Sequence, residues 1–115
     1  MSKTNTTVRH PYQDSAVSID ERIEDLLGRM TLEEKIYQMG SLVSLWWDES
    51  AEALRDKNKR FSPAKARKEI GKRGLSQLGW VVRSLSPRDG ARFSNAAQKF
   101  AREETRLGIP FIIHD

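Results

Sequence analysis

The chain has 115 residues, a formal net charge of +4, 37% hydrophobic and 31% charged residues, and no cysteine. This length is enough for one modest domain. No apolar run approaches the roughly 20 residues of a membrane helix, so a transmembrane segment within these residues is excluded. The absence of cysteine excludes disulfides, thiolate metal sites and a cysteine nucleophile, and it leaves the cellular compartment open.

The first residues, Met1 to His10, are polar and lack the apolar core of a secretory signal. We expect a flexible tail over residues 1–14, followed by a folded portion over residues 15–115. With no signal peptide visible, a cytoplasmic location and a periplasmic or secreted one both fit this sequence.

Two short helices are expected over residues 18–39. Ser18 and Glu21 have the spacing of a capping box, and Thr31 and Glu34 repeat it. Apolar residues recur at helical intervals through both segments, and Gly40 ends the second. We expect this apolar face to serve packing; its members are Ile23, Leu26, Leu27, Ile36 and Met39.

Residues 41–61 have no clear periodicity, and we predict a long loop there, with room for one helical turn. Ser62-Pro63 is a favourable helix start, which predicts a helix to about Ile70. The segment from Arg55 to Arg73 holds nine Lys and Arg against only Asp56 and Glu69, so the positive charge of the chain is concentrated there.

A strand, a helix and a second strand are predicted over residues 77–114. The apolar run from Gln77 to Leu85 has the length of a buried strand, Ser86-Pro87 begins a helix that runs to Arg106, and Ile109 to Ile113 forms the next strand. A helical crossover makes the two strands parallel. Because two strands cannot make a stable parallel sheet, the pattern looks interrupted at Asp115.

Two stretches carry a resemblance to a known family. One is Tyr12 to Met39, which includes Arg29-Met30-Thr31-Leu32-Glu33-Glu34-Lys35-Ile36; the other runs from Asn95 to Pro110 and ends in Arg106-Leu107-Gly108-Ile109-Pro110. They resemble the N-terminal domain of family 3 glycoside hydrolases, which include β-glucosidases and β-xylosidases. The resemblance implies an α/β fold, the first part of a (β/α)8 TIM-like barrel truncated after its second strand.

The activity that the resemblance implies is retaining, exo-acting hydrolysis of terminal β-linked sugars, with β-glucosides as the first expectation and β-xylosides as the next. Such hydrolysis uses one carboxylate as nucleophile and another as acid and base. In that family both lie far beyond these residues, so we expect no catalytic residue here, no activity of residues 1–115 alone, and a need for the missing C-terminal part of the same chain. The implied substrate is an oligosaccharide or glycoside, and no cofactor, metal or membrane is implied.

Three residues are candidates for substrate binding. In the family an acidic residue shortly after the Ile-Pro strand binds sugar hydroxyls; Asp115 is one candidate, and the usual spacing favours the position just after it. Trp46 and Trp47 could stack on sugar rings, or could pin the loop to the domain.

An alternative interpretation of the sequence belongs to a different class of function, that of binding modules. A small basic module could contact nucleic acid or another polyanion through Arg55 to Arg73. Only Phe61 interleaves with these charges and no nucleic-acid motif accompanies them, so we favour the hydrolase.

Overall fold

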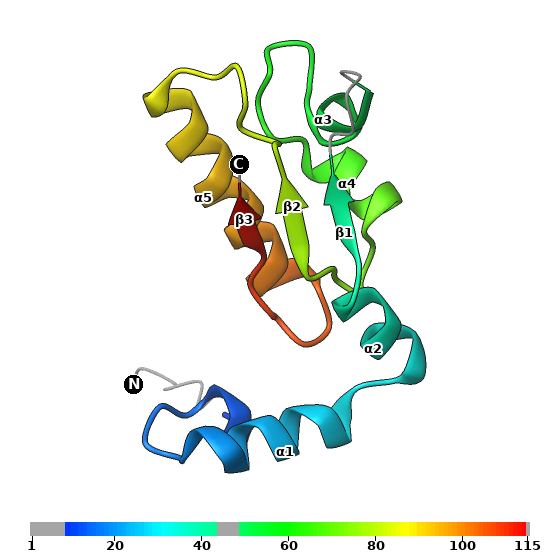
Figure 1. Cartoon of the computed structure of the whole chain (residues 1–115), viewed down its shortest axis with the longest axis vertical. Coiled ribbons are helices and arrows are strands. Elements are labelled where there is room, and N and C mark those ends of the chain that lie inside the picture. Colours follow the sequence, from blue (N-terminus) through cyan, green and yellow to red (C-terminus); the bar gives the residue numbers. More distant parts are fainter. Residues whose placement is uncertain (1–8, 44–48, 115) are drawn as a thin grey trace, which may run out of the picture. The chain divides into compact units, whose positions relative to one another are not determined.

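A computed structural model describes residues 9–43 and 49–114 of the chain. Contacts divide the chain into two compact units, residues 1–31 and residues 32–115. Figure 1 labels the helices and strands of both units.

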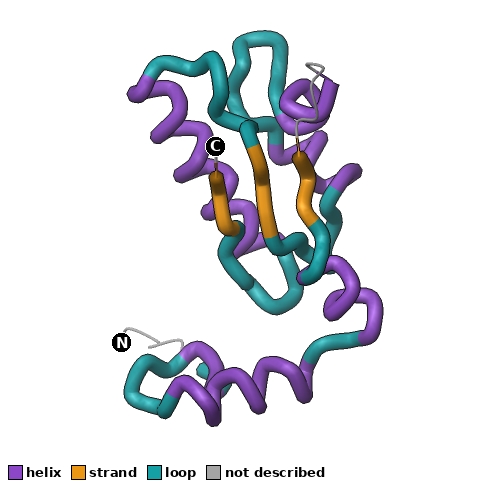
Figure 2. The backbone as a smooth tube through the Cα atoms, viewed as in Figure 1, coloured by secondary structure: helices purple, strands orange, loops and turns teal. Residues whose placement is uncertain are grey.

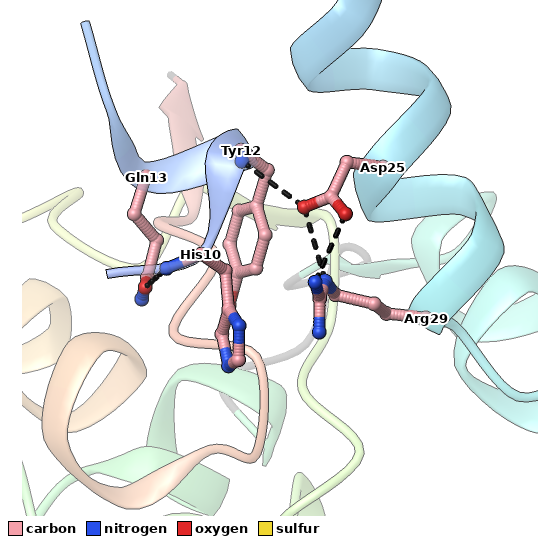
Figure 3. A network of polar contacts seen from close by, with 5 residues as sticks. All are labelled: His10, Tyr12, Gln13, Asp25 and Arg29. Atoms are coloured by element: carbon pink, nitrogen blue, oxygen red, sulfur yellow. Dashed lines mark hydrogen bonds and ion pairs between the residues drawn. The ribbon is translucent and has the colours of Figure 1, made fainter. Parts of the chain in front are cut away.

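The first unit consists of a short 3-10 helix, η1 (Pro11–Gln13), and helix α1 (Ile19–Arg29). The predicted cap of α1 is present, since the Ser18 hydroxyl oxygen accepts a hydrogen bond from the Glu21 N–H at 3.3 Å. Figure 3 shows how η1 is fixed to α1: the Asp25 carboxylate accepts from the Tyr12 N–H at 3.1 Å and from the Arg29 guanidinium at 3.0 Å. Residues 11–13 thus lie against α1, and the flexible tail expected over residues 1–14 stays a prediction.

The predicted apolar face of the two N-terminal helices is largely exposed in the structure. Helix α1 contains no buried residue, and Ile23 and Leu27 are exposed. After helix α2 (Leu32–Gln38), Met39 is 83% exposed. The role of this face in packing stays a prediction.

The second unit is built on a sheet of three parallel strands in the order β1 (Ser41–Val43), β2 (Gln77–Gly79) and β3 (Ile112–His114). Figure 2 shows the three strands side by side. Leu78 aligns with Leu42 on one side and Ile113 on the other. The predicted parallel pairing across a helical crossover is confirmed.

The extent of the second predicted element was wrong. We expected a strand from Gln77 to Leu85, but β2 ends at Gly79 and a turn follows. Trp80 and Ser84 have φ of 55° and 67°, which takes the backbone out of the strand conformation. In this turn Val81 is buried and Trp80, Val82 and Leu85 are half-buried, and apolar content alone does not distinguish such a turn from a buried strand.

Residues 41–61 were also predicted incorrectly as a loop. They contain β1 and helix α3 (Glu49–Leu54), and Arg55 pairs with Phe61 in an isolated antiparallel bridge. A three-residue strand is too short to show a period in the sequence. The missing third strand of the sheet lay in this segment.

The last strand begins later than predicted, at Ile112 rather than Ile109. We expected this strand to pair with the residues from Trp80 to Arg83, but it pairs with Gln77–Gly79. Gly108 has a φ of 65°, and the turn there brings the chain back along helix α5 (Pro87–Glu104). The Gln98 side chain then fixes the approach to the strand, because its amide both donates to the Phe111 carbonyl at 2.7 Å and accepts from the Phe111 N–H at 2.9 Å.

The two helices predicted from Ser-Pro starts are confirmed. In α4 (Pro63–Glu69) and in α5 the serine before the proline caps the helix by accepting a backbone N–H, from Lys65 and Asp89 respectively. Both helices lie on the same side of the sheet, behind it in Figure 1. The core between them and the sheet includes Leu54, Phe61, Ile70, Leu78, Val81, Phe93, Phe100 and Phe111.

Only one face of this sheet is packed by described residues. Leu78 is fully buried and Ile113 packs against the core, whereas Ile112, whose side chain points to the opposite face, is 60% exposed. Parallel sheets are ordinarily covered on both faces. The second unit is therefore a small α/β unit in which the described residues pack one face of the sheet.

A charged pair joins α2 to the end of the crossover. Glu34 is 4% exposed, and both of its carboxylate oxygens accept hydrogen bonds from Arg106, at 2.6 and 2.5 Å. These two residues are 72 positions apart in the sequence. The pair therefore links the first helix of the second unit to the segment just before its last strand.

Candidate functional site

The carboxyl ends of the parallel strands meet at one edge of the sheet, where α/β proteins bind their ligands. Trp80 follows β2 and His114 ends β3, and the Trp80 N–H donates to the His114 carbonyl at 2.8 Å. Figure 1 shows the connection between α3 and α4 and the connection after β2 above this edge. We take this edge as the candidate site.

The three residues predicted to bind substrate lie outside the described residues. Trp46 and Trp47 fall within residues 44–48, directly after β1 in the chain, and Asp115 directly follows β3. All three therefore occupy sequence positions just beyond a strand end that belongs to this edge. Their part in binding stays a prediction.

Trp80 is a candidate that the sequence analysis missed. It was predicted as a strand residue, but it stands half-buried at the carboxyl end of β2 with left-handed backbone geometry. The Arg83 guanidinium carbon lies 5.5 Å from the centre of its ring. The serines at 84 and 86, which interrupt the apolar run, were the available signal that the strand ended early.

Arg55 holds the turn that carries Trp80. Its side chain is buried, with 6% of the residue exposed, and Nη2 donates to the Val81 carbonyl at 2.6 Å and the Arg83 carbonyl at 3.0 Å. The guanidinium carbon also lies 6.0 Å from the centre of the Phe93 ring. A buried arginine thus supplies hydrogen bonds to the carbonyls of Val81 and Arg83, which lie in the turn beyond the strand.

A hollow of about 950 Å³ lies beside this edge. Its walls come from the connection before α4, from the connection before α5, and from the first turns of α5. The charged residues that line it are Lys59, Arg60, Asp89 and Arg92. The size is that of small-molecule pockets in proteins.

Much of the basic segment is engaged within the fold. Arg67 pairs with Glu104 at 2.5 Å, and the Lys65 ammonium donates to the Glu52 carbonyl at 2.9 Å. The hydrogen bonds from Arg67 lower the pKa of Glu104. Arg73 stacks on Tyr37, with 3.9 Å from its guanidinium carbon to the ring centre. The segment is thus not one continuous stripe of free cations.

Neither a metal site nor a membrane span is found in the part of the chain that the structure describes. No group of three or more His, Asp or Glu side chains is arranged to hold a metal ion there. None of the described helices combines the length and the apolar character needed to cross a bilayer.

Comparisons with known proteins point to one kind of enzyme. A protein of Formosa agariphila named for β-xylosidase activity is 32% identical over 100 residues, and β-glucosidase C of Emericella nidulans is 34% identical over 102. A protein of Aspergillus oryzae, also named β-glucosidase C, is 31% identical over 104 residues. The chain is similar to β-glucosidases and a β-xylosidase. The resemblance predicted from the sequence is confirmed at this level.

The matches cover most of this chain and little of each relative. They take in 86% of the chain for the F. agariphila protein and 89% for the other two, but only 12% and 15% of the relatives' own lengths. No family model matches the chain.

Proposed function

We propose that this chain is part of a retaining, exo-acting β-glycosidase of glycoside hydrolase family 3. Its substrate would be a glycoside or oligosaccharide with a terminal β-linked glucose or, as second choice, xylose. The observation that carries the proposal is the match to β-glucosidases and a β-xylosidase along 86–89% of the chain.

The fold is compatible with the barrel that this proposal requires. A (β/α)8 barrel is built from parallel strands with helices on the outer face, and its inner face is covered by the other strands. The described part of residues 32–114 has parallel strands, helices on one face, and on the opposite face the exposed Ile112. In a barrel that opposite face would line the interior, and residues 15–115 would form the first part of that domain.

The proposal gives the carboxyl edge of the sheet its role. In barrel enzymes this end holds the substrate, so Trp80 and the predicted residues Trp46, Trp47 and Asp115 would contribute to sugar binding. The nucleophile and the acid/base would come from other segments of the enzyme, about 5–5.5 Å apart as retention requires.

The test is to express the complete product of the gene and measure the release of aryl alcohol from aryl β-glucosides and β-xylosides. Hydrolysis of one or both is expected, and NMR of the first-formed sugar should show the β-anomer, because retention proceeds through two inversions. An α-anomer as first product would contradict the retaining mechanism, and no turnover on any β-glycoside would contradict the activity.

The same preparation can test the rival reading. If the basic segment were a nucleic-acid site, the protein would retard DNA or RNA in a gel, with affinity falling steeply as salt rises. We expect no retardation at physiological salt.

A further inference from the structure

We propose that the hollow beside the strand ends binds an oxyanion, a carboxylate or sulfate, carried by a saccharide. This inference rests on the proposed function, and it makes acidic glycosides the substrates of the enzyme. The hollow would hold a substituent of the sugar or of the group attached to it.

The charge of the hollow is the first argument. Lys59, Arg60 and Arg92 line it, and no ion pair joins any of them to a carboxylate in the described part of the chain. Against these three cations the lining has one carboxylate, Asp89, whose Oδ2 accepts the Ser86 hydroxyl at 2.9 Å. The hollow therefore has an excess of positive charge, whereas a neutral sugar would need none.

A buried arginine behind the wall of the hollow adds to this positive charge. Phe61 and Phe93 line it and meet edge to face, with ring centres 5.5 Å apart. Behind them lies the buried Arg55, which no described carboxylate pairs with and whose Nε has no hydrogen-bond partner among the described residues. A buried cation facing a low-dielectric aromatic wall is weakly screened and strengthens anion binding in front of that wall.

The hollow lies close to the end of the sheet at which we expect the substrate to bind. Asn58 to Phe61 belong to the connection between α3 and α4, and Ser84 to Ser86 to the connection between β2 and α5. The second of these connections begins at the carboxyl end of β2, the end at which barrel enzymes hold their substrate. A hollow walled on several sides also suits a compact sugar acid better than an extended polyanion.

The experiment is isothermal titration of the complete gene product with glucuronate, glucose 6-sulfate, glucose and inorganic sulfate at low ionic strength. The two acidic sugars should bind more tightly than glucose, and added salt should weaken them. The double substitution Arg60→Gln with Arg92→Gln should weaken the acidic sugars about five- to tenfold, since each exposed pair contributes about 0.2–1 kcal/mol, and should leave glucose unchanged.

Arg88→Gln is the matched control, because Arg88 is an exposed arginine of the same helix that does not line the hollow. It should leave all four affinities unchanged. Equal effects of the control and the double variant, or equal binding of inorganic sulfate and the acidic sugars, would overturn the proposal. Tight binding of a DNA oligonucleotide that displaces the acidic sugars would do the same in favour of a nucleic-acid surface.

Hydrolysis supplies a readout that separates this proposal from the proposed function. For aryl β-glucosides with and without a carboxylate on the aryl group, the double variant should raise KM for the acidic substrate only and leave kcat unchanged. Turnover without this difference would refute the anion site and keep the glycosidase; anion binding without any turnover would refute the glycosidase alone.

Discussion

Gly108 shows how one residue fixes the entry to β3. Its φ of 65° is rarely adopted by residues with a side chain, and a Cβ built there would approach the Arg102 carbonyl oxygen to 3.2 Å. The Gly108 N–H also donates to the Thr105 hydroxyl at 3.2 Å. The glycine lets the chain leave α5 and reverse toward the sheet.

Gly108→Ala should therefore lower the free energy of unfolding by about 1–3 kcal/mol, the usual cost of a strained backbone conformation. Chemical denaturation measures the loss. Gly90→Ala is the control, since a Cβ at this helical position would meet the Val82 Cβ at an ordinary 3.7 Å, and it should stabilise by up to about 1 kcal/mol. Equal stabilities of the two variants would show that the turn at 108 is not constrained.

Arg55 has an equally specific role, which is to hold the turn after β2. Arg55→Met keeps the length of the buried side chain and removes the donors to the Val81 and Arg83 carbonyls. We expect a loss of about 2 kcal/mol, because buried acceptors would be left without partners. Amide hydrogen exchange should speed up most in the turn of residues 80–85. Faster exchange spread evenly over the second unit would contradict a local role.

At the scale of elements, the attachment of η1 to α1 depends on the charge of Asp25. The hydrogen bonds from Arg29 hold the pKa of Asp25 below its ordinary value of 3.8. A lowered pKa in the folded state means that the stabilisation is fully present above pH 3.8 and is lost as the pH falls through the folded-state pKa.

We expect the backbone amide of Tyr12 to lose protection from exchange in that acid range, since its N–H donates to Asp25. The Asp25 titration midpoint, followed by NMR, should rise toward its ordinary value in Arg29→Gln. Arg9→Gln serves as a charge-matched control and should leave that midpoint in place. A midpoint unaffected by Arg29→Gln would show that the pair does not form in solution.

Elements with their own start signals could be predicted from the sequence, and those defined by distant contacts could not. Three helix starts can be recognised from neighbouring residues alone: the Ser-Pro pairs at 62–63 and 86–87, and the cap at Ser18. β1 is a strand because Ser41–Val43 pair with β2, more than thirty residues away. The turn after Gly79 likewise depends on Arg55, so it could not be read from residues 77–85.

The candidate site could be predicted only in part, for the same reason. The resemblance directed attention to the segment after β3, and the aromatic pair to the segment after β1. Trp80 and the charged hollow were missed because each is assembled from separate segments of the chain. The charge excess of the basic segment could be predicted from the sequence. Which of its cations form ion pairs or hydrogen bonds could be seen only in the structure.

At the scale of the whole molecule, the sheet face opposite the helices governs the behaviour of residues 1–115 made alone. Ile112 is exposed there, and β3 has a described strand on one side only. Apolar strands with an unpaired edge associate with other chains. We expect concentration-dependent self-association by light scattering, no turnover of aryl β-glucosides, and less association in Ile112→Lys.

The exposed Ile19→Lys variant is the control for charge alone, since Ile19 lies in α1 and away from the sheet in sequence. Measurable turnover by residues 1–115, or a stable monomer with a sharp cooperative transition, would contradict the view that further chain completes this sheet.

The Glu34–Arg106 pair has a consequence for the order of events during synthesis. At a ribosome adding about 5–20 residues per second, Glu34 leaves the tunnel roughly 4–14 s before the arginine that lies 72 positions later. During that interval the buried Glu34 carboxylate lacks the two hydrogen bonds that Arg106 donates to it. We therefore expect α2 to dock in its final position only after the crossover has been synthesised.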